Sequence, residues 1–199
     1  MSARDRWGDQ PGDADFQITH PSFLASLIWM LILTLGAIGV TFALSCLTPF
    51  AALAVALAGT IGLRASLRIV VVVWFANQVI GFGFFHFPHT SNTFLWGAAI
   101  GGAATVTTVA ASLVMKYGSS WATLLRLGIA FLVSFAVYEM TLLGAAALLG
   151  GFETFRPAVV AQLALVNAVS LVGMVVLNEL AAALCRPWLG RIPRLVRSW

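Results

Sequence analysis

The chain has 199 residues, of which 60% are apolar and only 9% are charged. Soluble domains carry charge on about a quarter of their residues, so this composition indicates an integral membrane protein. It leaves no room for a nucleotide-binding domain or an extramembrane catalytic domain. The formal net charge of +4 does not indicate a nucleic-acid partner, because the basic residues lie where membrane topology places them.

The chain begins with a polar segment, residues 1–21, which predicts a mostly disordered cytoplasmic tail. Six apolar runs then predict one all-α domain, residues 22–185, built as a bundle of six transmembrane helices. Short connections make successive helices antiparallel neighbours. The second run is short for a membrane span. The runs are Phe23–Ser45, Pro49–Leu63, Ser66–Phe85, Thr93–Met115, Trp121–Leu149 and Pro157–Leu184.

Lys and Arg predict the orientation of the bundle. With the N-terminus in the cytoplasm, ten of the eleven basic residues fall on the cytoplasmic side, and only Arg156 falls outside. We therefore expect both termini in the cytoplasm and a multi-pass protein of a bacterial-type inner (plasma) membrane. Residues 186–199 combine basic and large apolar side chains, which predicts an amphipathic tail drawn to anionic lipids at the inner leaflet.

The third apolar run contains an amide pair, Asn77 and Gln78, followed by Gly81. Amides inside a membrane segment are costly unless a partner or a ligand satisfies them. Gly81 lacks a side chain and allows the backbone near a ligand. The pair is interpreted either as lining a cavity or as a bridge between helices, and both interpretations stay open.

The connection after this run is rich in aromatic and polar residues. It contains Phe85, His86, His89 and Asn92 directly above the amide pair. These residues predict a lid over a ligand cavity. The alternative is that the two histidines are solvated loop residues.

Polar residues of two later runs fall at similar depth. Tyr138 and Glu139 lie just past the middle of the fifth run, and Asn167 lies near the middle of the sixth. Together with the amide pair they predict a cavity that is open to the outside. Glu139 is the only acid well inside the bundle, so it is a candidate functional residue. Alternatively it is a protonated structural acid bonded to Asn77, Gln78 or Asn167.

Small residues recur at four-residue spacing in three runs, which lets helix backbones approach closely. The series Gly97, Gly101 and Thr105 is interpreted as internal packing. The series that start at Gly36 and Ala54 are interpreted as possible docking faces for a partner membrane protein. The common hydrolase, protease and nucleotide-binding motifs are missing, and Cys46 and Cys185 do not form a metal-binding pair. We therefore expect a protein that is not an enzyme and has no cofactor of its own.

The length, the short-looped helices, the outward polar cavity and the loop after the third run resemble the substrate-binding S component of energy-coupling-factor (ECF) vitamin transporters. The segment from Asn77 to Phe82, with the following aromatic residues and Pro88, is most similar to the solitary corrinoid-specific branch. The resemblance implies a vitamin-like substrate, possible cobalamin (vitamin B12) binding, a transmembrane coupling subunit and two ATPases. From the depth and chemistry of the polar and loop residues described above, the expected substrate-binding residues are Asn77, Gln78, Gly81, Phe85, His86, His89, Asn92, Tyr138, Glu139 and Asn167.

A cysteine reaches the cobalt in this branch, and the sequence has no Cys in the corresponding loop. His86 or His89 is the expected axial ligand in its place, because imidazole is a good cobalt ligand. A corrinoid would then be the transported substrate rather than a cofactor. Two other functions stay open: an accessory or assembly subunit of a larger membrane complex, and a membrane enzyme that acts on a lipid or a quinone.

Overall fold

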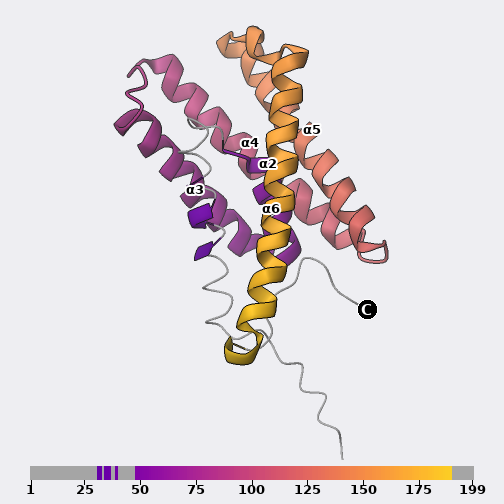
Figure 1. Ribbon diagram of the computed structural model, residues 1–199. Helices are drawn as coiled ribbons and strands as arrows, with labels where there is room; N and C mark the ends of the chain where they lie inside the picture. The colour runs from indigo at the N-terminus through magenta and orange to yellow at the C-terminus, as the bar shows by residue number, and fades with distance from the viewer. Residues whose placement is uncertain (1–30, 33, 37–38, 40–47, 190–199) are drawn as a thin grey trace, which may run out of the picture.

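The structure is a computed structural model that describes residues 31–32, 34–36, 39 and 48–189 (Figure 1). The predicted tail at residues 1–21, most of the predicted first helix and residues 190–199 lie outside the described part. The described residues of the first run are helical. The described chain is all-helical, as the composition predicts, and contains no strand.

Four helices are long and apolar enough to cross a membrane, which indicates a multi-pass membrane protein. They lie within a few residues of the predicted third to sixth runs, except that the last helix continues five residues past its predicted end at residue 184. The four helices are α3 (Leu63–Gly83), α4 (Ser91–Tyr117), α5 (Thr123–Leu149) and α6 (Pro157–Leu189).

The four long helices run alternately in opposite directions, as Figure 1 shows. Arg64 lies in the first turn of α3, Lys116 in the last turn of α4 and Arg126 in the first turn of α5. All three therefore lie at one end of the bundle. Arg156 directly precedes α6 at the opposite end. This separation of basic residues is what the predicted orientation requires, and the orientation in the cell stays a prediction.

The second apolar run forms a helix that is too short to span a membrane by itself, unlike the spanning helix predicted there. It forms α2 (Phe50–Thr60), a helix of 11 residues. At 1.5 Å per residue it is about 16 Å long, roughly half the hydrocarbon thickness. Its first eight residues are buried, and it packs against all four long helices at the centre of the bundle (Figure 1). An apolar helix is stable both against lipid and against apolar protein side chains. Hydropathy alone therefore did not distinguish a membrane-spanning helix from a helix buried inside the bundle.

The small residues of α2 therefore pack inside the protein. Ala54 is fully buried and Ala58 is half-buried, whereas Gly62 after the helix is exposed, so the α2 part of that series is not an exposed docking face. The interpretation of the series in α4 is confirmed. A Cβ atom at Gly101 would lie 2.7 Å from the Trp74 ring of α3, and the Trp74 indole Nε1 donates a hydrogen bond to the Gly97 carbonyl oxygen at 2.8 Å.

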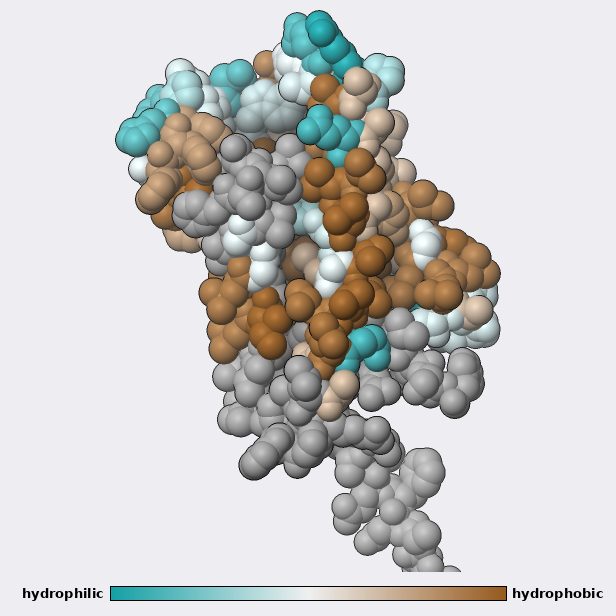
Figure 2. Space-filling model, viewed as in Figure 1, coloured by the Kyte–Doolittle hydropathy of each residue, from teal (hydrophilic) through white to brown (hydrophobic). Residues whose placement is uncertain are grey.

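The outer surface of the bundle is apolar over most of the described face. Figure 2 shows hydrophilic residues gathered at the end that carries the α3–α4 and α5–α6 connections. The second connection contains a short 3-10 helix, η1 (Phe152–Phe155). On α5, Leu132 and Leu148 are largely exposed. This distribution suits a bundle whose sides contact lipid and whose ends contact water.

Helix α6 is held to the bundle through α2. It packs against α2 and η1, and within the described residues it makes no extensive contact with α3, α4 or α5. The central short helix is thus the element that joins α6 to the α3–α4–α5 layer. It also determines where the cavity of the bundle lies.

Candidate functional site

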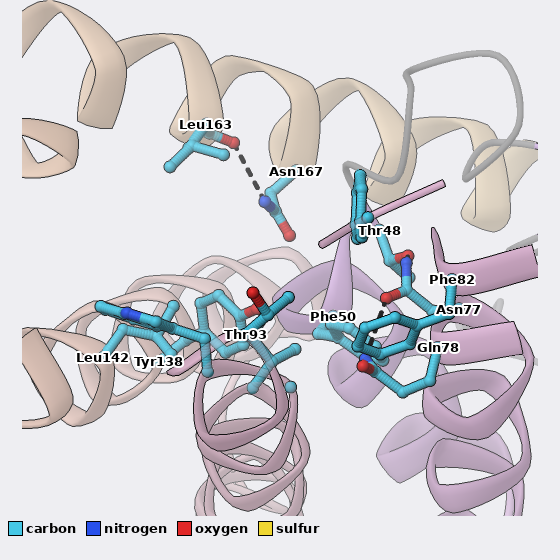
Figure 3. A pocket seen from close by; sticks show the side chains of 14 residues that line it. Thr48, Phe50, Asn77, Gln78, Phe82, Thr93, Tyr138, Leu142, Leu163 and Asn167 are labelled. Atoms are coloured by element: carbon cyan, nitrogen blue, oxygen red, sulfur yellow. Dashed lines mark hydrogen bonds between the residues drawn. The ribbon is translucent and has the colours of Figure 1, made fainter. Parts of the chain in front are cut away.

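A cavity of about 370 Å³ lies where α2 begins, and α3, α4, α5 and α6 complete its wall (Figure 3). We call it the central pocket. Figure 3 shows Thr48, Asn77 and Gln78 on one side of it, and Tyr138 and Leu142 on the other. The lining residues are Thr48, Phe50, Asn77, Gln78, Phe82, Phe87, Thr93, Trp96, Gly97, Ile100, Tyr138, Leu142, Leu163 and Asn167.

The amide pair forms a short relay of hydrogen bonds along the pocket wall. Gln78 Nε2 donates to Asn77 Oδ1 at 3.3 Å, and Asn77 Nδ2 donates to Thr48 Oγ1 at 2.8 Å. Asn77 is 7% exposed, so its amide has little access to water. The two bonds supply the partners that water would otherwise provide. The relay fixes the two amides and links α3 to the segment that enters α2.

Gly97 of α4 makes room for the Gln78 side chain. A Cβ atom at position 97 would overlap Gln78 Oε1. A larger residue would therefore displace the Gln78 amide from the wall. The glycine series in α4 thus does more than bring two helices together, because one of its members shapes the pocket.

Asn167 of α6 connects the pocket to the start of α2. Its Oδ1 accepts a hydrogen bond from the Ala52 backbone N–H at 3.2 Å, and its Nδ2 donates to the Leu163 carbonyl oxygen at 3.0 Å. The first N–H groups of any α-helix lack a partner within the helix. Because α2 begins inside the protein rather than in water, the Asn167 side chain provides an acceptor that solvent would otherwise provide.

Aromatic rings form much of the apolar wall. The Phe50 and Tyr138 rings lie 6.1 Å apart, and Phe82 stacks on Phe94 with centroids 4.7 Å apart. Phe87 comes from the α3–α4 connection and lies over Gly81, where a Cβ atom would approach its ring to 2.8 Å. The connection therefore contributes a ring to the pocket.

The structure brings four of the predicted substrate-binding residues together in the pocket lining: Asn77, Gln78, Tyr138 and Asn167. Gly81 is buried beneath Phe87. The other five predicted residues lie outside the lining. Phe85 is half-buried, His86, His89 and Asn92 are exposed, and Glu139 is partly buried. The substrate-binding role of all ten residues stays a prediction.

The two histidines lie near the pocket but do not line it. The His89 ring lies 5.4 Å from the Phe82 ring, and His86 has a positive φ of 53° in the turn after α3. Among the described residues, no group of three His, Cys, Asp or Glu side chains is arranged to hold a metal ion. The axial cobalt ligand stays a prediction that rests on the resemblance alone.

Glu139 is not part of the amide relay. Its Oε1 is buried without a hydrogen-bond partner, and the partners of Gln78 and Asn167 are other groups. Among the described residues no hydrogen bond joins Glu139 to Gln78 or Asn167, so the interpretation of Glu139 as a bonded structural acid finds no support there. The acid lies on the side of α5 next to Tyr138 but outside the pocket lining.

Sequence reasoning did not include Thr48, Phe50 and Gly97 among the binding residues, although all three line the pocket. Thr48 and Phe50 flank a proline at the start of α2. A proline there indicates a helix start, but not that the start is buried. Gly97 was assigned to helix packing, and nothing in the sequence pairs it with Gln78.

The arrangement is suited to binding. Its lining offers amides, hydroxyl groups, an indole and aromatic rings, and none of the lining side chains is charged at neutral pH. Comparison of the chain with known protein families, with curated proteins and with solved structures finds no match.

Proposed function

We propose that the protein is a membrane-embedded substrate-binding subunit that takes up a vitamin-like small molecule from the outside of the cell. One observation carries the proposal. Polar side chains from α3, α5 and α6, which are far apart in the sequence, lie around one cavity inside a membrane bundle. Buried polar groups gathered around a cavity are typical of a ligand site, since packing alone would favour apolar contacts.

The pocket lies toward the end of the bundle that is expected to face outward. Phe87 of the α3–α4 connection contributes to its lining, and that connection lies opposite the end with Arg64, Lys116 and Arg126. Under the positive-inside rule the ligand then enters from the outside. The segment from Phe85 to Asn92 acts as the lid. As in S components, release to the inside would require a transmembrane coupling subunit and ATPases.

The volume of the pocket favours a small ligand. About 370 Å³ is near the lower end of the range for ligand sites, about 300 to 1,000 Å³. A corrinoid carries a macrocycle with many side groups, so its entry would require the lid to open and His86 or His89 to turn inward. We therefore propose a small vitamin-like molecule as the ligand. A corrinoid is the larger alternative, which requires the lid to open.

The test uses two Leu→Trp variants on the same helix. Leu142 lines the pocket, whereas Leu132 is 66% exposed on the outer surface of α5. Wild type, Leu142→Trp and Leu132→Trp are purified from membranes in lipid nanodiscs, and the released small molecules are identified by mass spectrometry. We expect one molecule to co-purify with wild type and Leu132→Trp, and to fall at least about tenfold in Leu142→Trp, because the larger indole side chain projects into the space of the ligand.

Two results would contradict the proposal. One is equal recovery of the molecule from all three proteins, which would place it outside the pocket. The other is the absence of any small molecule together with a membrane protein that co-purifies in fixed stoichiometry, which would indicate an accessory subunit.

A further inference from the structure

We infer that the central pocket selects an uncharged ligand with a flat ring and an amide edge, that is, a carboxamide or lactam group that both donates and accepts hydrogen bonds. The inference rests on the proposed function and narrows its substrate class. It follows from the charges, the unsatisfied polar atoms and the rings of the lining.

Among the described residues, the lining contains no ionic partner for a charged ligand. None of its 14 residues is Asp, Glu, Lys, Arg or His. Taking an ion out of water is expensive unless a countercharge or several strong hydrogen bonds compensate. An uncharged group of the same shape avoids most of that cost.

The beginning of α2 does not compensate for the missing cation. A helix N-terminus attracts anions through its exposed N–H groups. Here the Ala52 N–H is bonded to Asn167 Oδ1 at 3.2 Å, and the Phe50 N–H is bonded to the Thr48 carbonyl oxygen at 2.9 Å. These groups already have acceptors within the protein, so an anionic ligand would have to displace them.

Three polar atoms of the lining have no hydrogen-bond partner among the described residues. They are Gln78 Oε1, which only accepts, Trp96 Nε1, which only donates, and the Tyr138 hydroxyl group, which does both. The amide relay determines that Gln78 offers an acceptor to the pocket. Gln78 Nε2 donates to Asn77 Oδ1, which leaves Gln78 Oε1 available to a ligand. A ligand donor can therefore bond Gln78 Oε1, and a ligand acceptor can bond the Tyr138 hydroxyl group or the Trp96 indole.

An amide edge supplies both groups without a charge, whereas a carboxylate supplies only acceptors. Gly97 permits this position of the Gln78 oxygen, because the oxygen occupies the space where a side chain at position 97 would be. The ligand body faces rings of Phe50, Phe82, Phe87 and Trp96. Such walls favour a flat apolar ring, which stacks offset or edge-on against them.

The experiment compares quinoline-3-carboxamide with quinoline-3-carboxylate at pH 7, which share shape and differ in charge and donor. Each is titrated into the protein in phosphatidylcholine nanodiscs by calorimetry. We expect the carboxamide to bind at least about tenfold more tightly than the carboxylate. Gln78→Leu should weaken carboxamide binding by about tenfold, while Gln162→Leu, at an exposed amide of α6, should leave it unchanged.

Trp96→Phe provides a second variant that keeps an aromatic ring and removes the donor, in case Gln78→Leu does not fold. It should weaken the carboxamide by about threefold to tenfold. Tighter or equal binding of the carboxylate overturns the inference, as does unchanged carboxamide binding in both pocket variants. Binding of neither probe also overturns it. In each case, loss of the co-purified molecule in Leu142→Trp would leave the proposed function standing.

Discussion

Helices α3 and α4 border two cavities of the same volume, about 370 Å³ each, and the two differ in chemistry. The central pocket carries amides, hydroxyl groups and aromatic rings. The second cavity, which we call the outer groove, is lined almost entirely by apolar atoms. Its residues are Val70, Val71, Trp74, Ala98, Gly101, Gly102, Thr105 and Val106.

The difference lies in how the polar groups are satisfied. In the outer groove, Trp74 Nε1 bonds the Gly97 carbonyl oxygen and Thr105 Oγ1 bonds the Gly101 carbonyl oxygen, both at 2.8 Å. Nothing polar is left for a ligand there, so the groove suits a lipid chain. In the central pocket, Gln78 Oε1 accepts no hydrogen bond from the part of the chain that the structure describes. Equal volume therefore does not indicate equal function, because the remaining hydrogen-bonding capacity distinguishes a ligand site from a packing defect.

The largest expected effect concerns the side chain that joins α6 to the pocket. Asn167→Leu removes the acceptor of the buried Ala52 N–H, and we expect the free energy of unfolding to fall by about 2 kcal/mol. The control is Gln162→Leu on the same helix, at an exposed position, which should change it by less than about 0.5 kcal/mol. Unfolding is followed by SDS titration in mixed micelles. Equal losses from both variants would show that the bond to α2 is not important for stability.

A matched Thr→Val pair sharpens the comparison of the two cavities. Thr48→Val in the central pocket removes the acceptor of Asn77 Nδ2 and should cost about 1 kcal/mol, within the range for hydrogen bonds between membrane helices. Thr105→Val in the outer groove removes only a bond within its own helix, so we expect a change below about 0.5 kcal/mol. SDS titration again measures both. A larger loss for Thr105→Val would contradict the distinction drawn between the cavities.

The smallest effect is expected at Glu139, which lines neither cavity. Because its buried Oε1 has no partner, Glu139→Leu should leave stability unchanged or raise it by up to about 1 kcal/mol. Glu139→Gln keeps a polar group there and should gain less. Both variants should retain the co-purified molecule. Loss of that molecule in Glu139→Gln, at wild-type stability, would assign the acid a role in binding after all.

The sequence predicted the four long helices closely, because a run of about 20 apolar residues has few alternatives in lipid. It also identified the amide pair at Asn77 and Gln78, since amides are rare and costly in such runs. It did not predict which loop residues reach the pocket. Phe87 lines it, while His86 and His89 do not, because a turn with one positive φ value directs neighbouring side chains to different sides.

Hydropathy by itself determined that the chain is a multi-pass helical protein, since every backbone polar group in lipid must bond within a helix. Only the tertiary structure decided that α2 is a central, buried helix, because lipid and protein interior are equally apolar and the same residues suit both. The tertiary structure also determined which residues from different helices contact one another around the pocket. Asn167 bonds Ala52, 115 residues away, and Gly97 accommodates Gln78. Such pairs depend on how the helices pack, which the local pattern of each run does not encode.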